Sequence, residues 1–465
     1  MTEHMSPEEF RRHGHRMIDW IADYLEHADR HPVLPRVEPG EIRARIPDRA
    51  PEQPEPFERI AADLDEVVMP GITHWQSPNF FAFFPANTSP PAILGDLAAA
   101  GLGVQGMLWA TSPACTEVEN AVLDWLVDLL GLPEDWKTTG PGGGVIQMSA
   151  SDSTHTALVV ARERAGAPAE RVVAYASEQA HSSIEKGARV AGYGRVRTIP
   201  VDGVYAMRPE ALAAAIAEDR AAGLAPAFVC STVGTTGTTA VDPVRAIGEV
   251  ARTEGIWNHV DAAYAGSAMI CPEFRHHQDG LELVDSYVFN PHKWMLTNFD
   301  SSVFYVADRR PLIETLSILP PYLRNAATES GAVIDYRDWH LPLGRRFRSL
   351  KLWFVLRSYG AEGIRAYIRE HVGLAAGLDA RLAADPRFEV IAPTTFALVS
   401  FAHTAGDGAT DRLAAAINAS GEAYVTASRL GERPFIRVAI GQTRTGREHV
   451  DRLWDLIDSL AEPVG

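Results

Sequence analysis

The sequence is short of cysteine, with three in 465 residues: Cys115, Cys230 and Cys271. Their wide spacing supplies neither a disulfide framework nor a zinc-binding pattern, so we expect a reducing compartment, the cytoplasm. The sequence also lacks an apolar run long enough to cross a bilayer, and no signal peptide precedes the first expected helix. Membrane insertion and secretion are therefore disfavoured.

Basic residues are in deficit as well. The chain has 43 lysines and arginines against 60 aspartates and glutamates, a net charge of -17. This balance argues against nucleic acid and anionic membranes as partners, and it says little about a zwitterionic substrate. Hydrophobic residues make up 46% of the chain. That content can fill a large core, and the length allows two or three domains.

The glycine signatures of nucleotide-binding folds are missing too. No Gly-x-Gly-x-x-Gly motif follows the first expected strand, and residues 161–166 form no Walker loop, which disfavours a Rossmann oxidoreductase. Apolar strands instead alternate with amphipathic helices, which predicts an α/β fold with a large, mostly parallel sheet. The expected strands are 145–148, 172–176, 227–232 and 256–260, and the expected helices are 154–164, 183–190, 209–222 and 243–254.

The two ends of the chain differ from this middle. Ser6 begins a helix with an apolar stripe over residues 10–25, and the frequent prolines of residues 32–56 predict an extended arm. Beyond about residue 349, helices alternate with short strands, which predicts a small α+β domain. The expected division is an N-terminal helical segment and arm over 1–88, a large α/β domain over 89–350 and the small domain over 351–465.

Lys293 is the first candidate catalytic residue. It lies in Asn290-Pro291-His292-Lys293-Trp294, on a short connection between two expected strands. Aromatic neighbours would desolvate its ammonium group, lower its pKa and leave the amine able to form a Schiff base with an aldehyde. A solvated lysine on a surface loop is the alternative interpretation.

Three upstream stretches would complete a site for pyridoxal 5'-phosphate (PLP). Asp261 ends an apolar strand, where a carboxylate needs a cationic partner such as a protonated ring nitrogen. Residues 142–144 are glycines that lead into Ser149-Ala150-Ser151 at a helix start, a setting that favours a phosphate. His181 follows a strand and can stack on a pyridine ring. The candidate residues Ser149, His181, Thr236, Asp261 and Lys293 all follow strands, at the edge where open α/β sheets bind ligands.

Seven stretches resemble the aromatic-L-amino-acid decarboxylases, which are group II PLP-dependent decarboxylases. The matching stretches are 74–82, 112–117, 179–183, 259–267, 271–276, 290–294 and 342–351. The resemblance covers nearly the whole chain and implies the PLP-dependent transferase fold (aminotransferase fold type I). It also implies a PLP cofactor, no metal, and a homodimer whose two active sites take residues from both subunits, with the N-terminal segment as the dimerisation arm.

The resemblance implies a role for each cofactor residue. Lys293 would hold the cofactor aldehyde, Asp261 would keep the ring nitrogen protonated, and His181 would stack on the ring. The complete cofactor-binding set that it implies is Ser149, Ala150, Ser151, His181, Thr236, Asp261, Ala263, Asn290, His292 and Lys293. The resemblance places Thr236 near the cofactor's phenolic oxygen or the substrate, and His292 near the phosphate. Thr236 could equally be an ordinary turn residue, and His292 could simply orient Lys293. Arg337 matches a family arginine to which we assign a structural role.

The substrate region departs from the animal-type enzymes. The implied substrate-binding residues are Phe83, Phe84, Ala86, Met107 and His181. Phe83-Phe84-Pro85-Ala86 replaces Tyr-Phe-Pro-Thr and removes two hydroxyl groups, so a carboxylate contact there is lost unless Asn87 or Thr88 compensates. Met107 replaces a phenylalanine and gives a more adaptable wall. The resemblance implies an aromatic L-amino acid as substrate, and these two changes leave open whether it is of the tryptophan, DOPA, tyrosine or phenylalanine type.

Residues 316–332 include Pro320-Pro321-Tyr322 and predict a loop able to cover the site. The resemblance implies Tyr322 as the proton donor after carbon dioxide leaves, and the implied product is an arylalkylamine. One alternative is an aromatic aldehyde synthase, which typically differs at the positions of His181 or Tyr322. Another is a non-catalytic binding protein, against which Lys293, Asp261 and His181 argue.

Overall fold

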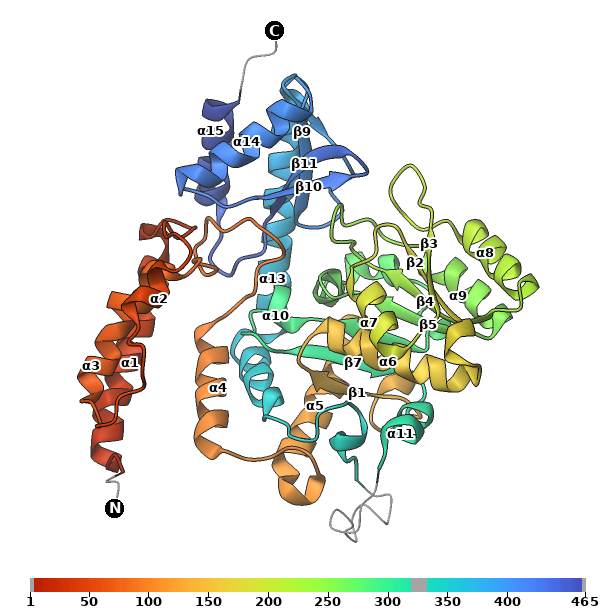
Figure 1. Ribbon diagram of the computed structural model, residues 1–465, viewed down its shortest axis with the longest axis horizontal. Helices are drawn as coiled ribbons and strands as arrows, with labels where there is room; N and C mark the ends of the chain where they lie inside the picture. The colour runs from red at the N-terminus through yellow and green to blue at the C-terminus, as the bar shows by residue number, and fades with distance from the viewer. Residues whose placement is uncertain (1–3, 319–332, 462–465) are drawn as a thin grey trace.

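The computed structural model describes residues 4–318 and 333–461. Two β-sheets organise these residues (Figure 1): a seven-stranded mixed sheet in the middle of the chain and a four-stranded antiparallel sheet near its C-terminal end. Helices cover the larger sheet on both faces, so the fold is the α/β architecture that the sequence predicts.

The large sheet has the strand order β1-β7-β6-β5-β4-β2-β3. Its strands are β1 (Gly143–Gln147), β2 (Val172–Ser177), β3 (Arg195–Ile199), β4 (Ala225–Thr232), β5 (Trp257–Asp261), β6 (Ser286–Phe289) and β7 (Ser302–Val306). The strands from β2 to β6 pair in parallel, whereas β7 is antiparallel to both β6 and β1. The strands β1 to β6 therefore end at one common edge of the sheet.

The alternating side chains of β2 explain why helices cover both faces of this sheet. Ala174 and Ala176 belong to the main core cluster, together with residues of α6 (Ala150–Ala165) and α7 (Ser183–Ala191). Val173 and Tyr175 belong to a second cluster with residues of α8 (Pro209–Ala221) and α9 (Val244–Glu254). Successive strand residues point to opposite faces, so each face needs its own helices. The other helices of this part are α5 (Pro113–Leu130), α10 (Pro291–Trp294) and α11 (Arg310–Leu316).

A long helix, α13 (Arg348–Ala384), joins the two sheets (Figure 1). It bends at Gly360, whose φ of 64° and ψ of 171° are not helical. Beyond it, the small sheet has the order β10-β11-β9-β8 and carries α14 and α15. The bounds are β8 (Phe388–Val390), β9 (Leu398–His403), α14 (Asp407–Ser420), β10 (Thr426–Leu430), β11 (Arg433–Ala439) and α15 (Arg447–Leu460).

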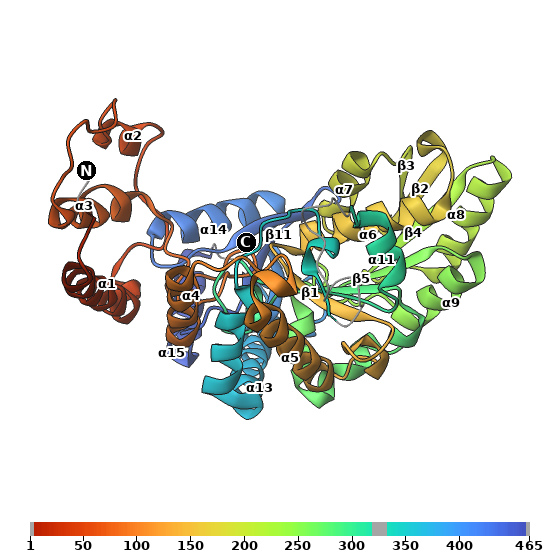
Figure 2. The ribbon, with the colours of Figure 1, turned by 90° about the horizontal axis from the view of Figure 1, so that it is seen from below.

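The N-terminal helices stand away from the rest of the molecule (Figures 1 and 2). They are α1 (Pro7–His27), α2 (Glu41–Arg45) and α3 (Phe57–Asp63), followed by α4 (Pro90–Leu102), which packs on α13. Ser6 caps α1 as expected: its side chain accepts from the Glu9 amide, and Glu9 bonds back to Ser6. His13 is the one buried residue of α1.

Three features differ from the expected elements or add to them. The proline-rich arm contains the short helix α2, because residues 41–45 lie between prolines and are free of them. The edge strands β3 and β10 were not among the expected strands. In the described residues, no helix combines the length and the apolar character needed to span a membrane. The division into domains at 88 and 350 stays a prediction.

Candidate active site

A pocket of about 230 Å³ lies at the edge where strands β1 to β6 end. Each of five strands contributes the segment that follows it, as expected for an open α/β sheet. Phe84 and Phe299 add aromatic walls. The predicted site residues that line this pocket are Phe84, Ser149, Ala150, Ser151, His181, Thr236, Asp261, Ala263, Asn290, His292 and Lys293.

Lys293 lies in the one-turn helix α10, directly after β6. Its Nζ is 5.4 Å from the centre of the Phe84 ring. Burial lowers the pKa of Lys293, the nearby Asp261 partly opposes this shift, and the positive charge of Arg437 adds to it. A larger neutral fraction of the amine is the state needed for attack on an aldehyde.

Asp261 is the last residue of β5 and is 6% exposed. One carboxylate oxygen accepts a hydrogen bond from the Ala263 amide at 2.9 Å. Within the described part of the chain, no arginine, lysine or histidine forms an ion pair with this carboxylate. A buried carboxylate without an ion-pair partner fits the protonated ring nitrogen of PLP.

The pocket has donors suited to a phosphate. Ser149 caps α6, and the first turn of that helix carries Ala150 and Ser151. His292 accepts the Ser301 amide through Nδ1 at 2.9 Å, so its proton is on Nε2. Burial lowers the pKa of His292 to about 3, which keeps the ring neutral. Asn290 also lines the pocket, and its Oδ1, which is an acceptor and not a donor for the phosphate, is buried without a hydrogen-bond partner among the described residues. These features fit PLP.

The glycines at 142–144, expected to lead into the phosphate cradle, do not line the pocket. A Cβ on Gly143 would lie 2.7 Å from the Trp339 ring, and one on Gly144 would lie 2.7 Å from the Tyr305 ring. These glycines therefore make room for aromatic rings at the start of β1. The interpretation of this triplet as part of a phosphate cradle is wrong in this structure.

His181 lies at the open side of the pocket, after β2. Its Nδ1 accepts from the Ser183 amide at 3.1 Å, which leaves the proton of the neutral ring on Nε2. Another hollow, of about 770 Å³, shares His181 and extends along α7 and β3. The imidazole thus stands between the pocket and this second hollow.

Three predicted residues of the described part of the chain do not line this pocket. Phe83 is 44% exposed and stacks on Trp75 at 5.6 Å. Ala86 is partly buried, and its carbonyl accepts from the side-chain amide of Gln76 at 3.0 Å. The Met107 carbonyl accepts from the backbone amide of Arg337. Tyr322 lies outside the described residues.

Arg337, to which the sequence assigned a structural role, is 6% exposed. Its Nε lies 3.5 Å from the neighbouring Asp338, and its amide holds the Met107 carbonyl at 3.0 Å. These contacts place Arg337 beside the segment that precedes α5.

Arg437 of β11 is a charged neighbour that the sequence analysis missed. It is 3% exposed, and its guanidinium carbon lies 5.1 Å from the centre of the same Phe84 ring. Its Nη2 donates to the Phe83 carbonyl at 3.4 Å, and no carboxylate of the described residues pairs with it. Burial lowers the pKa of Arg437 to about 10. The sequence did contain a signal for it: residues 435–440 form an apolar run typical of a strand, and an arginine inside such a run is unusual.

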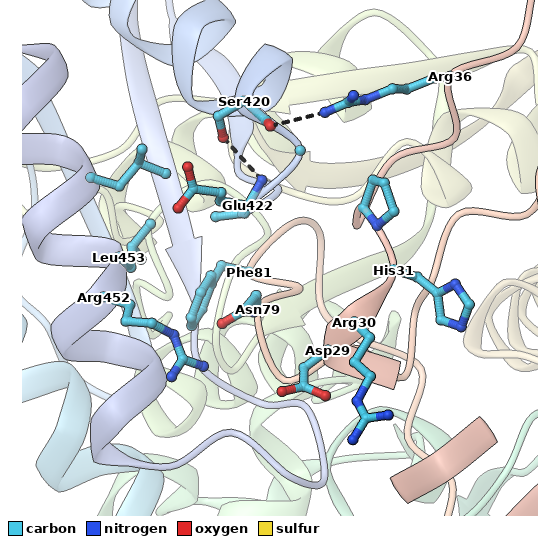
Figure 3. A pocket seen from close by; sticks show the side chains of 14 residues that line it. Asp29, Arg30, His31, Arg36, Asn79, Phe81, Ser420, Glu422, Arg452 and Leu453 are labelled. Carbon is cyan, nitrogen blue, oxygen red and sulfur yellow. Dashed lines mark hydrogen bonds between the residues drawn. The ribbon is translucent and has the colours of Figure 1, made fainter. Parts of the chain in front are cut away.

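A hollow of about 380 Å³ lies between the arm and the small domain (Figure 3). Side chains of both charges line it, among them Asp29, Arg36 and Glu422. Arg36 reaches across and donates to the Ser420 carbonyl at 3.3 Å. The hollow is a joint between two segments and contains none of the predicted site residues.

The fold and the pocket together define a PLP-dependent enzyme of the α/β class. The profile described as the pyridoxal-dependent decarboxylase conserved domain matches residues 39–404. The chain therefore belongs to the pyridoxal-dependent decarboxylase family, its cofactor is PLP, and it is a lyase.

Some relatives of the chain are named as decarboxylases, and another is named as an aldehyde synthase. The chain is 46% identical to aromatic-L-amino-acid decarboxylase of Bos taurus, over 99% of this chain and 97% of that protein. It is 45% identical to phenylacetaldehyde synthase of Arabidopsis thaliana, over 98% and 96%. A crystal structure of Catharanthus roseus tryptophan decarboxylase in complex with L-tryptophan is similar with a TM-score of 0.94, at 42% identity, covering 98% of this chain and 99% of that one.

Proposed function

We propose that this protein removes the carboxylate of an aromatic L-amino acid as carbon dioxide and releases the corresponding arylalkylamine. The observation that carries this proposal is the meeting of Lys293 and the unpaired Asp261 carboxylate in one pocket with a polar cradle for a phosphate. Two relatives support it: one at 45% identity is named phenylacetaldehyde synthase, and one at 46% identity is named aromatic-L-amino-acid decarboxylase.

Bound PLP would supply an electron sink for the substrate's α-carbon. In this chain, Lys293 would hold the cofactor aldehyde and release it to the substrate amine. Asp261 would keep a proton on the ring nitrogen, and the neutral His292 would donate its Nε2 proton to the phosphate. His181 would cover one face of the ring from the open side of the pocket.

Arg437 is our candidate for the substrate carboxylate. An arginine that is 3% exposed and lacks a carboxylate partner is costly, and an anion from outside the chain would offset that cost. It lies over the same Phe84 ring as Lys293, which would release the cofactor aldehyde to the substrate amine. By binding the substrate carboxylate, Arg437 would replace the threonine hydroxyl that the animal-type enzymes have at the position of Ala86.

The aldehyde-forming reaction is the second candidate, because a relative named phenylacetaldehyde synthase is 45% identical over nearly the whole chain. His181 and Tyr322 are the residues of the amine-forming enzymes, which favours decarboxylation alone. The protein should be incubated with PLP and L-tryptophan, L-DOPA, L-tyrosine or L-phenylalanine. We expect carbon dioxide and amine in equal amounts; aldehyde with hydrogen peroxide in place of amine would reverse the choice.

Removing the Tyr322 hydroxyl tests its expected proton transfer. Tyr322→Phe should still release carbon dioxide, but without its proton donor the α-carbon would react with oxygen and yield aldehyde, ammonia and hydrogen peroxide. Amine, aldehyde and oxygen consumption should be measured on one sample. Undiminished amine with no oxygen uptake would remove Tyr322 from this role.

We also propose a homodimer with shared active sites. Exposed apolar side chains gather on the N-terminal helices and on α4, including Phe10 at 66%, Leu97 at 51% and Leu102 at 62%. A patch of this kind suits a second copy of the chain. Phe83, Ala86 and Met107, which do not line the pocket of their own chain, could then contribute to the partner's site.

The cytoplasm is the compartment that we propose. The three cysteines are buried and unpaired, as expected where thiols stay reduced. Fractionation of the source cells with an activity assay would test this.

A further inference from the structure

A column of parallel aromatic rings leads away from the pocket. Phe84 stacks on Tyr264, with ring centres 3.8 Å apart and planes at 10°. Tyr264 stacks in turn on Trp294, at 4.8 Å and 10°. Trp294 directly follows Lys293, and Lys293 Nζ lies over the Phe84 ring. The column therefore contacts the lysine at two points: Trp294 is its neighbour in sequence, and Phe84 is the ring that its amine faces.

His371 of α13 ends this column. The Trp294 indole Nε1 donates to His371 Nδ1 at 3.1 Å, and the planes of the two rings are at 7° to each other. His371 is 1% exposed and also bonds to the backbone of Thr445, after β11. Figure 1 shows α10 beside α13. His371 thus connects the lysine segment to the long helix and to the small domain.

The chemistry of these two rings makes the contact directional. An indole nitrogen can only donate, so Nδ1 of His371 accepts and the proton of the neutral ring is on Nε2. Burial lowers the pKa of His371 to about 4, so the ring stays neutral and able to accept near neutral pH. If the acceptor were removed, a buried N–H would remain without a partner, which is unfavourable and would draw the indole or a water molecule toward a new contact.

We propose that His371 is a positioning residue for Lys293: by accepting the indole hydrogen bond it fixes Trp294, and through Trp294 the Tyr264 and Phe84 rings that keep water from the lysine amine. Burial is the largest cause of the lowered pKa of Lys293. A loosened column should therefore admit water and return that pKa toward its ordinary value. The inference rests on the proposed function only for the catalytic role of Lys293.

The direct test measures the lysine itself, in the full-length protein freed of PLP. The sequence has four lysines, Lys137, Lys186, Lys293 and Lys351, so acetylation by acetic anhydride can be followed at each by peptide mass spectrometry over a range of pH. We expect His371→Leu to raise the midpoint pH for Lys293 labelling by about one unit. The midpoint for the exposed Lys186 should not move.

Two further variants separate positioning from general stability. His371→Asn keeps an acceptor where Nδ1 lies, so it should restore the parental midpoint. Ser286→Ala removes a different buried indole acceptor, that of Trp257 at 2.7 Å, at the start of β6 and away from the pocket. It should lower the melting temperature without moving the Lys293 midpoint. An unchanged midpoint in His371→Leu, or an equal shift in Ser286→Ala, would overturn the proposal.

Trp294→Phe keeps a ring in the column but has no N–H that needs an acceptor. In this background His371→Leu leaves no buried donor unpaired, so the double variant can be tested even if His371→Leu alone misfolds. We expect Trp294→Phe/His371→Leu to fold and to share the Lys293 midpoint of Trp294→Phe alone. A further shift in the double variant would show that His371 acts by another route, and the proposal would fail. With PLP and substrate, His371→Leu should lower kcat about tenfold and leave KM unchanged. Because labelling needs no substrate, failure of this inference is distinguishable from failure of the proposed function.

Discussion

The lysine segment, residues 290–296, and the N-terminal helix α1 are held in opposite ways. The segment is fixed at several points: the Asn87 amide donates to the His292 carbonyl at 2.7 Å, and the Asn87 side chain accepts from the Leu296 amide at 3.1 Å. In α1, His13 is buried and Phe10 is 66% exposed. The first region is held on several sides within one chain, whereas α1 leaves the apolar side chains of Phe10 and Ile18 exposed in the described part of the chain.

The difference separates two kinds of information in the sequence. Residues 290–296 carry their own structural context, because the strands on both sides fix where the lysine points. The stripe of α1 specifies only that something apolar must cover it. The first region can be tested by changing single side chains, and the second by removing the segment and observing the assembly.

Replacing Lys293 should have the largest effect. Lys293→Ala removes the amine that would hold the aldehyde, so turnover should be abolished, while Asp261 and the polar cradle should still retain PLP without a covalent bond. Amine formation and cofactor content should be measured on the same preparation. Lys186→Ala, at an exposed lysine outside the pocket, is the matched control. Turnover within tenfold of the parent would exclude Lys293 as the residue that binds the aldehyde.

Removing residues 1–56 should test the other side of the comparison. If the N-terminal helices cover a second copy of the chain, the truncated protein should lose the dimer, expose apolar surface, and become inactive or aggregate. Sedimentation velocity and activity would be measured together. A soluble and active monomer would contradict the proposed shared active site.

Asp261→Asn should have a smaller but still large effect. The amide cannot keep the ring nitrogen protonated, and we expect a loss of about a thousandfold in kcat, equivalent to roughly 4 kcal/mol of barrier. Asp279→Asn is a suitable control, because Asp279 pairs with Arg245 at 2.9 Å outside the pocket. Near-parental turnover with normal PLP content would show that Asp261 has another role.

Much of the site could be predicted because its residues follow buried strands. Asp261 and Lys293 come directly after apolar runs, and the edge at which such strands end is fixed by parallel pairing. The same reasoning did not predict the strands β3 and β10. Both lie at sheet edges with partly exposed residues, so they lack the apolar signal of a central strand.

The residues brought in by tertiary packing could not be predicted in this way. Arg437 reaches the pocket wall from the small sheet, and His371 reaches Trp294 from α13. Neither has a local pattern that names its partner. The glycine triplet shows the converse error, since glycines at 142–144 suit a phosphate loop equally well until Trp339 and Tyr305 occupy the space beside them.

The last prediction concerns Arg437, where the effect should be moderate and selective. Arg437→Met keeps an apolar stem against Phe84 and removes the charge. If the guanidinium receives the substrate carboxylate, KM for the amino acid should rise by about ten to a hundredfold, because a buried charged hydrogen bond is lost. The product amine has no carboxylate, so its inhibition constant should stay within about twofold of the parental value.

Two comparisons make this prediction selective. Arg433→Met removes another arginine of the same strand, one that is exposed and pairs with Glu389, and it should leave both constants unchanged. In Arg437→Met, the affinity for the amino acid should fall while that for the amine holds. An equal fall in the affinities for the amino acid and the amine would mean that Arg437 only shapes the wall around Phe84. The substrate carboxylate would then have to be bound by other residues of the pocket or by the second subunit.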